Sequence, residues 1–272
     1  MKYLKNGALL IVFFYFCGFS SDNSLWSSNN LGQYIPKEMN PGEDITYVVS
    51  YGFLKFGEVR LLILDQKERN GVIYYRTKAY IDSYNGIPFV SLHQIYESNF
   101  DKNLYSDFFR ATEKEKDYIK FTEYFFDYYS KTVHVKKGKY KPYEIWADST
   151  TGVKANYQDG LSLFYYARMN TGQKKSVNVP CFVTEDFVYT KINFYDKVEK
   201  TSIDAADYDI ASVRLDGHTD FVSIFGLTGN FEGWFTNDKY AVPTIAKMKV
   251  IIGNVTLELK NWKISGWNPP RI

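Results

Sequence analysis

The chain is poor in the residues that metal sites and catalytic sites use most often. Its 272 residues include two cysteines, Cys17 and Cys181, and three histidines, His93, His134 and His218, which lie far apart in the sequence. It has no glycine-rich nucleotide loop, no Gly-x-Ser-x-Gly motif and no His-Glu-x-x-His pair. We therefore predict a non-catalytic protein that uses no cofactor and holds no metal.

The chain also lacks an excess of charge of either sign. It has 33 Lys and Arg against 31 Asp and Glu, and residues 1–20 hold two of the bases and no acid. A balanced remainder argues against a nucleic-acid partner, because nucleic-acid-binding domains carry basic surfaces. Aromatic residues make up 18% of the chain. This content excludes a disordered chain and predicts a packed core.

Hydrophobic runs long enough to span a bilayer are missing too. Ala8–Phe16 is an apolar run of nine residues, whereas a spanning helix needs about 20. The run follows Lys2 and Lys5 and precedes a polar stretch, which is the layout of a secretory signal peptide. We therefore expect residues 1–20 to be cleaved after Ser20 and the protein to be exported, to the periplasm or the outer membrane.

Each cysteine raises a separate question. Cys17 follows the apolar run, so a lipid-modified cysteine is an alternative to cleavage after residue 20. Phe16 disfavours that alternative, because processing sites require small residues. Once the leader is removed, Cys181 has no partner for an internal disulfide. Its apolar, strand-like surroundings predict a buried and inert thiol.

Most of the chain has the pattern of β-strands. Residues 21–43 are rich in Ser, Asn, Gly and Pro, which predicts a flexible N-terminal arm. From Ile45 onward, apolar and polar residues alternate in short runs separated by turn residues. Asn70-Gly71 lies between two such runs and is a strong hairpin signal. The predicted strands are 45–51, 58–64, 72–80, 92–100, 105–112, 118–126, 131–136, 175–183, 187–198, 208–215, 229–236, 247–252 and 254–262.

One segment, residues 159–170, has helical spacing instead. Leu161, Phe164 and Tyr165 fall on one side of a helix that Asp159 can cap at its start. We predict about three turns of helix, with the aromatic side packed against or inside the sheet.

Together these elements predict an all-β, mainly antiparallel fold. We expect a large curved sheet or barrel-like β domain over residues 44–265, with one helix near residues 159–170. A division into two domains near residues 150–152 is the alternative.

Several segments, taken in order, are similar to one known family. They are Pro41-Gly42-Glu43, Tyr51–Glu58, Arg76–Tyr80, Tyr96–Asp101, Asp159–Ser162, Trp234–Asp238, Val242-Pro243 and Ile252–Val255. In this order and spacing, residues 41–262 resemble the exported bacterial family catalogued as domain of unknown function 3108. The resemblance implies export and a β fold. It implies no reaction and transfers no catalytic residue.

Three polar clusters offer weaker candidate sites. Residues 216–220 combine two carboxylates with His218 and could hold a metal, although the same residues are typical of a polar turn. Residues 113–117 alternate acids with lysines, which predicts a solvated hairpin tip more than a glycosidase pair. Residues 136–141 form a basic run that we expect to be a loop, and anionic lipid or glycan could contact it.

The strongest candidate site is apolar. The run from 121 to 129 places aromatic rings on both faces of one strand, so that both faces must be covered by core, helix, ligand or partner. Plain packing beneath the helix is the alternative. The predicted ligand-binding residues are Phe121, Tyr124, Phe126, Tyr128, Phe164 and Tyr165.

These observations favour one function over two others. We predict an exported binding module for an apolar or amphiphilic component of the cell envelope, such as a lipid. The first alternative is a structural component of the envelope that contacts a protein partner and has a filled core. The second is a hydrolase of an envelope polymer, which would require distant acids to converge.

Overall fold

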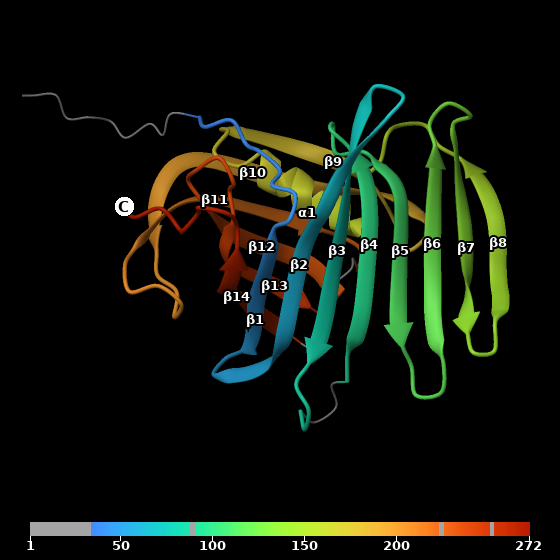
Figure 1. Ribbon diagram of the computed structural model, residues 1–272, viewed down its shortest axis with the longest axis horizontal. Helices are drawn as coiled ribbons and strands as arrows, with labels where there is room; N and C mark the ends of the chain where they lie inside the picture. The colour runs from blue at the N-terminus through green and yellow to red at the C-terminus, as the bar shows by residue number, and fades with distance from the viewer. Residues whose placement is uncertain (1–33, 88–90, 223–225, 251–252) are drawn as a thin grey trace, which may run out of the picture.

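The computed structural model describes residues 34–87, 91–222, 226–250 and 253–272. These residues form fourteen β-strands and one α-helix (Figure 1). In chain order the elements are β1 (Asp44–Tyr51), β2 (Leu54–Arg69), β3 (Val72–Ser83), β4 (His93–Asp101), β5 (Ser106–Lys114), β6 (Ile119–Asp127), β7 (Thr132–Tyr140), β8 (Glu144–Gly152), α1 (Gly160–Met169), β9 (Lys175–Val183), β10 (Asp186–Thr201), β11 (Ile210–Thr219), β12 (Leu227–Thr236), β13 (Pro243–Val250) and β14 (Gly253–Lys263).

All fourteen strands belong to one antiparallel sheet. Its order is β8-β7-β6-β5-β4-β3-β2-β1-β14-β13-β12-β11-β10-β9, so strands adjacent in the chain are adjacent in the sheet except for β8 and β9. The first and last strands pair with each other in the middle of the sheet. The two edges, β8 and β9, are consecutive in the chain, and the segment that joins them contains α1.

The sheet curls so that its two halves face each other across the helix. Figure 1 shows β1–β8 as one broad layer, with the strands of the second half turning behind it and α1 lying between. Twist of neighbouring strands and bulges both bend a sheet. Register shifts occur at Thr46/Tyr47 in the β1–β14 pairing, where the two halves meet, and at Val49/Ser50 and Ile63/Asp65 in the adjoining pairings of β2. The prediction of a mainly antiparallel, curved β fold with one helix is confirmed.

Helix α1 begins where the sequence predicts. The Asp159 carboxylate accepts hydrogen bonds from the backbone N–H groups of Leu161 and Ser162, at 2.7 and 2.9 Å, and the Ser162 hydroxyl accepts the Asp159 N–H. This capping box satisfies donors that the first turn leaves free. Leu161 and Tyr165 are fully buried, so the helix is wedged into the core.

The core falls into two clusters that meet at the helix. The larger one fills the inside of the β1–β8 half and includes Phe100, Leu161 and Tyr165. The smaller one lies under β9–β12 and includes Leu163 and Phe194. Because α1 contributes side chains to both, it holds the halves of the sheet at a set spacing.

Local turn chemistry explains the predicted hairpin. Asn70 and Gly71 have φ values of 53° and 74°, the left-handed conformations that a tight two-residue turn requires. The hairpin between β2 and β3 is therefore as predicted.

Two expectations about local structure were wrong, and one strand was missed. Residues 136–140 belong to β7, and a one-residue register shift at Lys137/Gly138 keeps this segment paired to β8. Residues 216–219 belong to β11 and form no turn, because Gly217 makes room for the Phe231 ring on the neighbouring strand. Strand β8 was missed in the sequence because it is exposed on both faces and has no apolar alternation.

Residues 34–43, the described part of the expected arm, lie against the sheet. The Gly42 N–H donates to Ile63 O at 2.7 Å, and the Glu38 N–H donates to Lys239 O at 2.8 Å. Glu43 is buried. The expected signal peptide, residues 1–20, lies outside the described residues. Within the described part of the chain, the structure has no helix of the length and apolarity that crossing a membrane requires.

Candidate functional site

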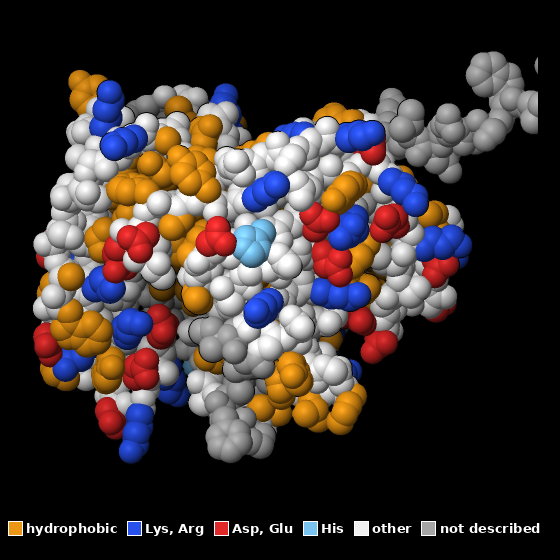
Figure 2. Space-filling model, turned by 180° about the vertical axis from the view of Figure 1, so that it is seen from behind, with side chains coloured by type: hydrophobic (Ala, Val, Ile, Leu, Met, Phe, Trp, Pro, Cys, Tyr) orange, Lys and Arg blue, Asp and Glu red, His pale blue; other side chains and the backbone are white. Residues whose placement is uncertain are grey.

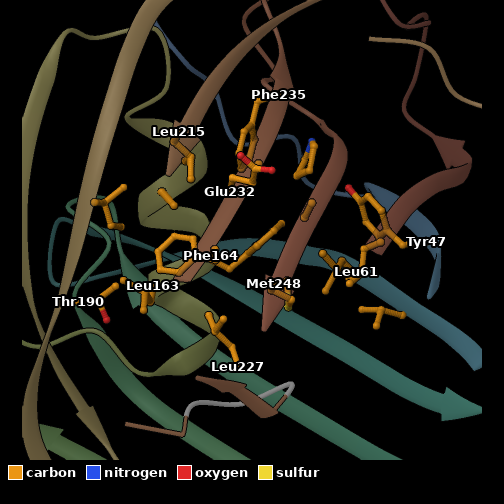
Figure 3. Close-up of a pocket in the computed structure, with 18 of the residues that line it drawn as sticks. Tyr47, Leu61, Leu163, Phe164, Thr190, Leu215, Leu227, Glu232, Phe235 and Met248 are labelled. Atoms are coloured by element: carbon orange, nitrogen blue, oxygen red, sulfur yellow. The ribbon is translucent and has the colours of Figure 1, made fainter. Parts of the chain in front are cut away.

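A cavity of about 130 Å³ lies inside the curl of the sheet, between α1 and strands β12–β14. Its wall is almost entirely apolar. Figure 3 shows Leu163 and Phe164 on the helix side of the cavity and Tyr47 and Leu61 on the opposite side. A cavity of similar volume lined by Leu, Ile and Phe stays dry and accepts a benzene-sized group.

Small residues on both walls leave this space open. Gly160 and Ala167 lie on the helix side. On the sheet side, Gly233 of β12 stands directly opposite Ala246 of β13. A side chain at either sheet position would extend toward the helix, so the pairing of two small residues makes a depression in the inner face.

Part of the apolar wall remains exposed. Phe164, Leu227, Met248 and Leu257 all line the cavity and all remain partly exposed. By contrast, Ile63 in the filled part of the core is 0% exposed. Apolar side chains that point inward and still meet open space are typical of a ligand site.

One polar group on the wall has no partner. The Tyr47 side chain is 3% exposed, and its hydroxyl has no hydrogen-bond partner among the described residues. Burial raises the pKa of Tyr47 well above its ordinary value of 10, so the hydroxyl stays protonated and can donate. An orphaned buried hydroxyl costs free energy, and this oxygen has less than 1 Å² of accessible surface, so it lies behind the cavity wall and does not meet the open space.

The other polar groups on the wall are already engaged. Glu232 accepts a hydrogen bond from Arg214 at 3.0 Å. Thr190 lies 3.6 Å from the Cys181 sulfur. Burial raises the pKa of that thiol to about 12, so Cys181 is a buried thiol and no nucleophile at neutral pH.

A second, smaller chamber of about 90 Å³ continues the first. The two share Val59, Met248 and Leu257 as wall residues. The second chamber adds Phe56 and Leu92, so the apolar space runs toward the end of the sheet that carries the β1–β2 turn.

The six residues predicted to bind a ligand are divided between the cavity and the core. Phe164 lines the cavity. Tyr165 is fully buried against Phe100, with ring centroids 5.4 Å apart. Tyr128 is half-buried and its hydroxyl donates to Tyr157 O at 3.3 Å.

The other three belong to strand β6. Phe121 is buried and stacks on Tyr140 at 4.6 Å, and Phe126 is buried against Phe182 at 5.8 Å. Tyr124 lines a separate, more polar pocket, where its hydroxyl donates to Glu185 at 3.1 Å. The aromatic run on β6 therefore faces other protein side chains at these three positions.

Sequence reasoning missed the wall residues on β12–β14. Their apolar alternation is the same signal that an ordinary core strand gives. The available clue was the small size of Gly233 and Ala246, but only the strand register places them opposite each other.

The polar clusters have ordinary surroundings. His218 lies 2.7 Å from Asp220 and 2.6 Å from Asn230, and hydrogen bonding to Asn230 and then Asp220 raises its pKa. In the part of the chain that the structure describes, no three His, Cys, Asp or Glu side chains group closely enough to hold a metal. Glu115 and Asp117 are exposed in the turn between β5 and β6, as predicted.

Comparison with known proteins gives a family and one structural likeness. No curated protein matches the chain. A solved structure described as a beta-barrel-like protein of domain of unknown function DUF1849 from Brucella abortus is similar, with a TM-score of 0.46 and 13% identity over 83% of this chain and 99% of that one. The family model described as protein of unknown function (DUF3108) matches residues 46–260, so the chain belongs to that family.

Proposed function

We propose that this protein binds one apolar or amphiphilic molecule in the cavity between α1 and strands β12–β14. The observation that carries the proposal is the partly exposed apolar wall at Phe164, Leu227, Met248 and Leu257. Each methylene that a ligand buries there contributes about 0.8 kcal/mol. With export expected from residues 1–20, the ligand we propose is a lipid or similar component of the cell envelope.

The buried Tyr47 hydroxyl offers the cavity no polar contact. Its nearest charged groups, Glu43 and Arg168, are already paired with each other. A charged group of a ligand would therefore be buried at this end of the cavity without a partner, which costs free energy. We infer a ligand whose buried part is apolar and uncharged.

The two alternative functions have less support. A structural protein with a filled core would have no reason to leave these inward side chains partly exposed. A hydrolase needs free acids at the site, whereas Glu232, the acid at the cavity wall among the described residues, is held by Arg214.

The test uses a substitution that fills the cavity with a larger side chain. It then measures binding of an apolar fluorescent probe, N-phenyl-1-naphthylamine. Ala246→Leu places extra carbons in the depression opposite Gly233, and we expect at least about a tenfold weaker Kd because the probe loses its space. The matched control is Ala147→Leu, the same change at an exposed position of β8. Thermal unfolding of both variants checks that they remain folded.

Two results would contradict the proposal. Equal binding by the Ala246→Leu variant, or no binding by the wild type, would overturn the proposal. Tyr47→Phe keeps the apolar wall and removes the hydroxyl. It should leave the Kd of the naphthylamine probe unchanged, because the hydroxyl lies behind the cavity wall. Native mass spectrometry of protein from its own envelope then identifies the ligand.

A further inference from the structure

An apolar rim lies at the end of the sheet toward which the second chamber runs. We define it by Tyr51, Phe53 and Leu54 of the β1–β2 turn and Leu92 before β4, with exposed fractions of 44%, 93%, 48% and 42%. Figure 2 shows hydrophobic side chains gathered at this lower edge of the molecule. Exposed apolar side chains scattered singly are normal, but a contiguous group indicates an interaction surface.

The fold holds these side chains together on a projecting tip. Tyr51 pairs with Leu54 across the turn, and Gly52 adopts a φ of 58° between them. The Tyr84 N–H donates to Phe56 O at 2.7 Å, which ties the segment after β3 to this hairpin. Phe53 at the tip is almost fully exposed, so its ring does not pack in the core and is free to make contacts outside the protein.

Lysines without an ion-pair partner lie near the apolar rim. Among the described residues, neither Lys55 beside the tip nor Lys249 in β13 has an ion-pair partner, and both are exposed. Of the neighbouring acids, Glu58 pairs with Lys260 at 2.6 Å, and Asp82 lies 2.9 Å from a ring nitrogen of His93. Free lysines beside exposed Phe and Leu are the combination that favours an anionic lipid surface.

The apolar rim also borders the ligand path. Leu92 belongs to the apolar rim and to the wall of the second chamber. In the pairing of β13 with β14, Lys249 lies opposite Asn254. Asn254 follows Gly253, which the Tyr51 ring covers. A molecule that leaves the chamber at this end therefore meets the apolar rim before it meets bulk water.

We propose that the apolar rim inserts into the surface of an anionic lipid bilayer and turns the second chamber toward the lipid. A convex tip with free lysines fits a bilayer better than it fits a protein groove. The direction of ligand transfer rests on the proposed function, but the membrane contact does not, because the rim residues lie outside the first cavity.

The experiment is sedimentation with phosphatidylcholine vesicles and with vesicles that also contain phosphatidylglycerol. It uses the chain from Ser21 onward, so that the apolar run 8–16 cannot bind lipid itself. The test variant is Phe53→Ser with Leu54→Ser. The control is Tyr129→Ser, because Tyr129 is 98% exposed in the turn between β6 and β7 at the opposite end of the sheet.

We expect the wild type to prefer the anionic vesicles and the double serine variant to bind them at least about tenfold more weakly. Lys55→Glu with Lys249→Glu should remove the preference, at about fivefold per lysine. The Tyr129→Ser variant should bind as the wild type does.

Three results would overturn the membrane contact: no binding of the wild type to either vesicle, an equal loss in the Tyr129→Ser variant, or self-association through the rim in place of vesicle binding. Probe binding in solution keeps the two proposals distinguishable, since the double serine variant should retain the naphthylamine Kd of the wild type.

Discussion

Glu43 and Arg168 are 125 residues apart in the chain, and both side chains are 0% exposed. The Arg168 guanidinium donates to Glu43 Oε2 at 2.7 Å, and its Nε donates to Tyr240 O at 2.8 Å. One side chain therefore joins the end of α1, the residue before β1 and the segment between β12 and β13. Removing one partner of such a pair leaves a buried charge uncompensated.

We expect Glu43→Gln to lower the free energy of unfolding by about 3–5 kcal/mol, measured by urea denaturation. Glu38→Gln is the control, because Glu38 forms an exposed pair with Lys239 at 3.0 Å. That variant should lose less than about 1 kcal/mol. Equal small losses in both variants would contradict a structural role for the buried pair.

At the scale of elements, the cap of α1 shows what a local pattern can and cannot indicate. The sequence predicts Asp159 as the N-cap because a capping side chain serves its own helix. It does not indicate that Ser98 of β4 and Ser106 of β5 both donate to the same carboxylate, at 2.6 Å each. These bonds attach the start of the helix to the sheet.

The Asp159 carboxyl also gives a pH dependence of known sign. Burial raises its pKa above the ordinary 3.8. Since the folded state then holds the proton more tightly than the unfolded state, the stability from this group falls as pH rises from about 4 toward the raised pKa. The advantage of the wild type over Asp159→Asn in free energy of unfolding should therefore shrink as pH rises above about 4.

Asp127 is the control for that measurement. It is exposed, and hydrogen bonding from the Ser130 backbone lowers the pKa of its carboxyl. Its stabilising effect is present above the unfolded pKa and is lost as pH falls through the folded value. Asp127→Asn should thus show the opposite trend at acid pH, and matching trends in the two variants would rule out the assignment.

A strand can be recognised from the sequence when one of its faces is buried. Where a strand has one face in the core, as in β1, the alternation of apolar residues predicts it closely. Where both faces meet solvent, as in β8, the backbone pairing with β7 determines the strand and the side chains carry no periodic signal.

At the scale of the whole molecule, the pairing of β1 with β14 joins the two halves into one continuous sheet that curls around two core clusters. Helix α1 supplies Leu161 to one cluster and Leu163 to the other. Because the halves are joined by the β1–β14 ladder and share α1, we expect them to unfold together.

Truncation of one core ring in each half tests this cooperativity. Phe100→Ala and Phe194→Ala should each lower the free energy of unfolding by about 3–5 kcal/mol. Each should shift one urea transition, with the same midpoint by tryptophan fluorescence and by far-ultraviolet circular dichroism. Two separate transitions, with each substitution moving only one of them, would instead indicate two domains.

The sequence by itself determined the β class, the turn at Asn70-Gly71 and the start of α1, because strand alternation, turn conformation and capping all depend on neighbours in the chain. Only the tertiary structure decided that Gly233 lies opposite Ala246 at the cavity, that Glu43 meets Arg168, and that the apolar rim borders the second chamber. Each of these contacts depends on the register and curvature of the sheet, and those follow from packing between residues far apart in the chain.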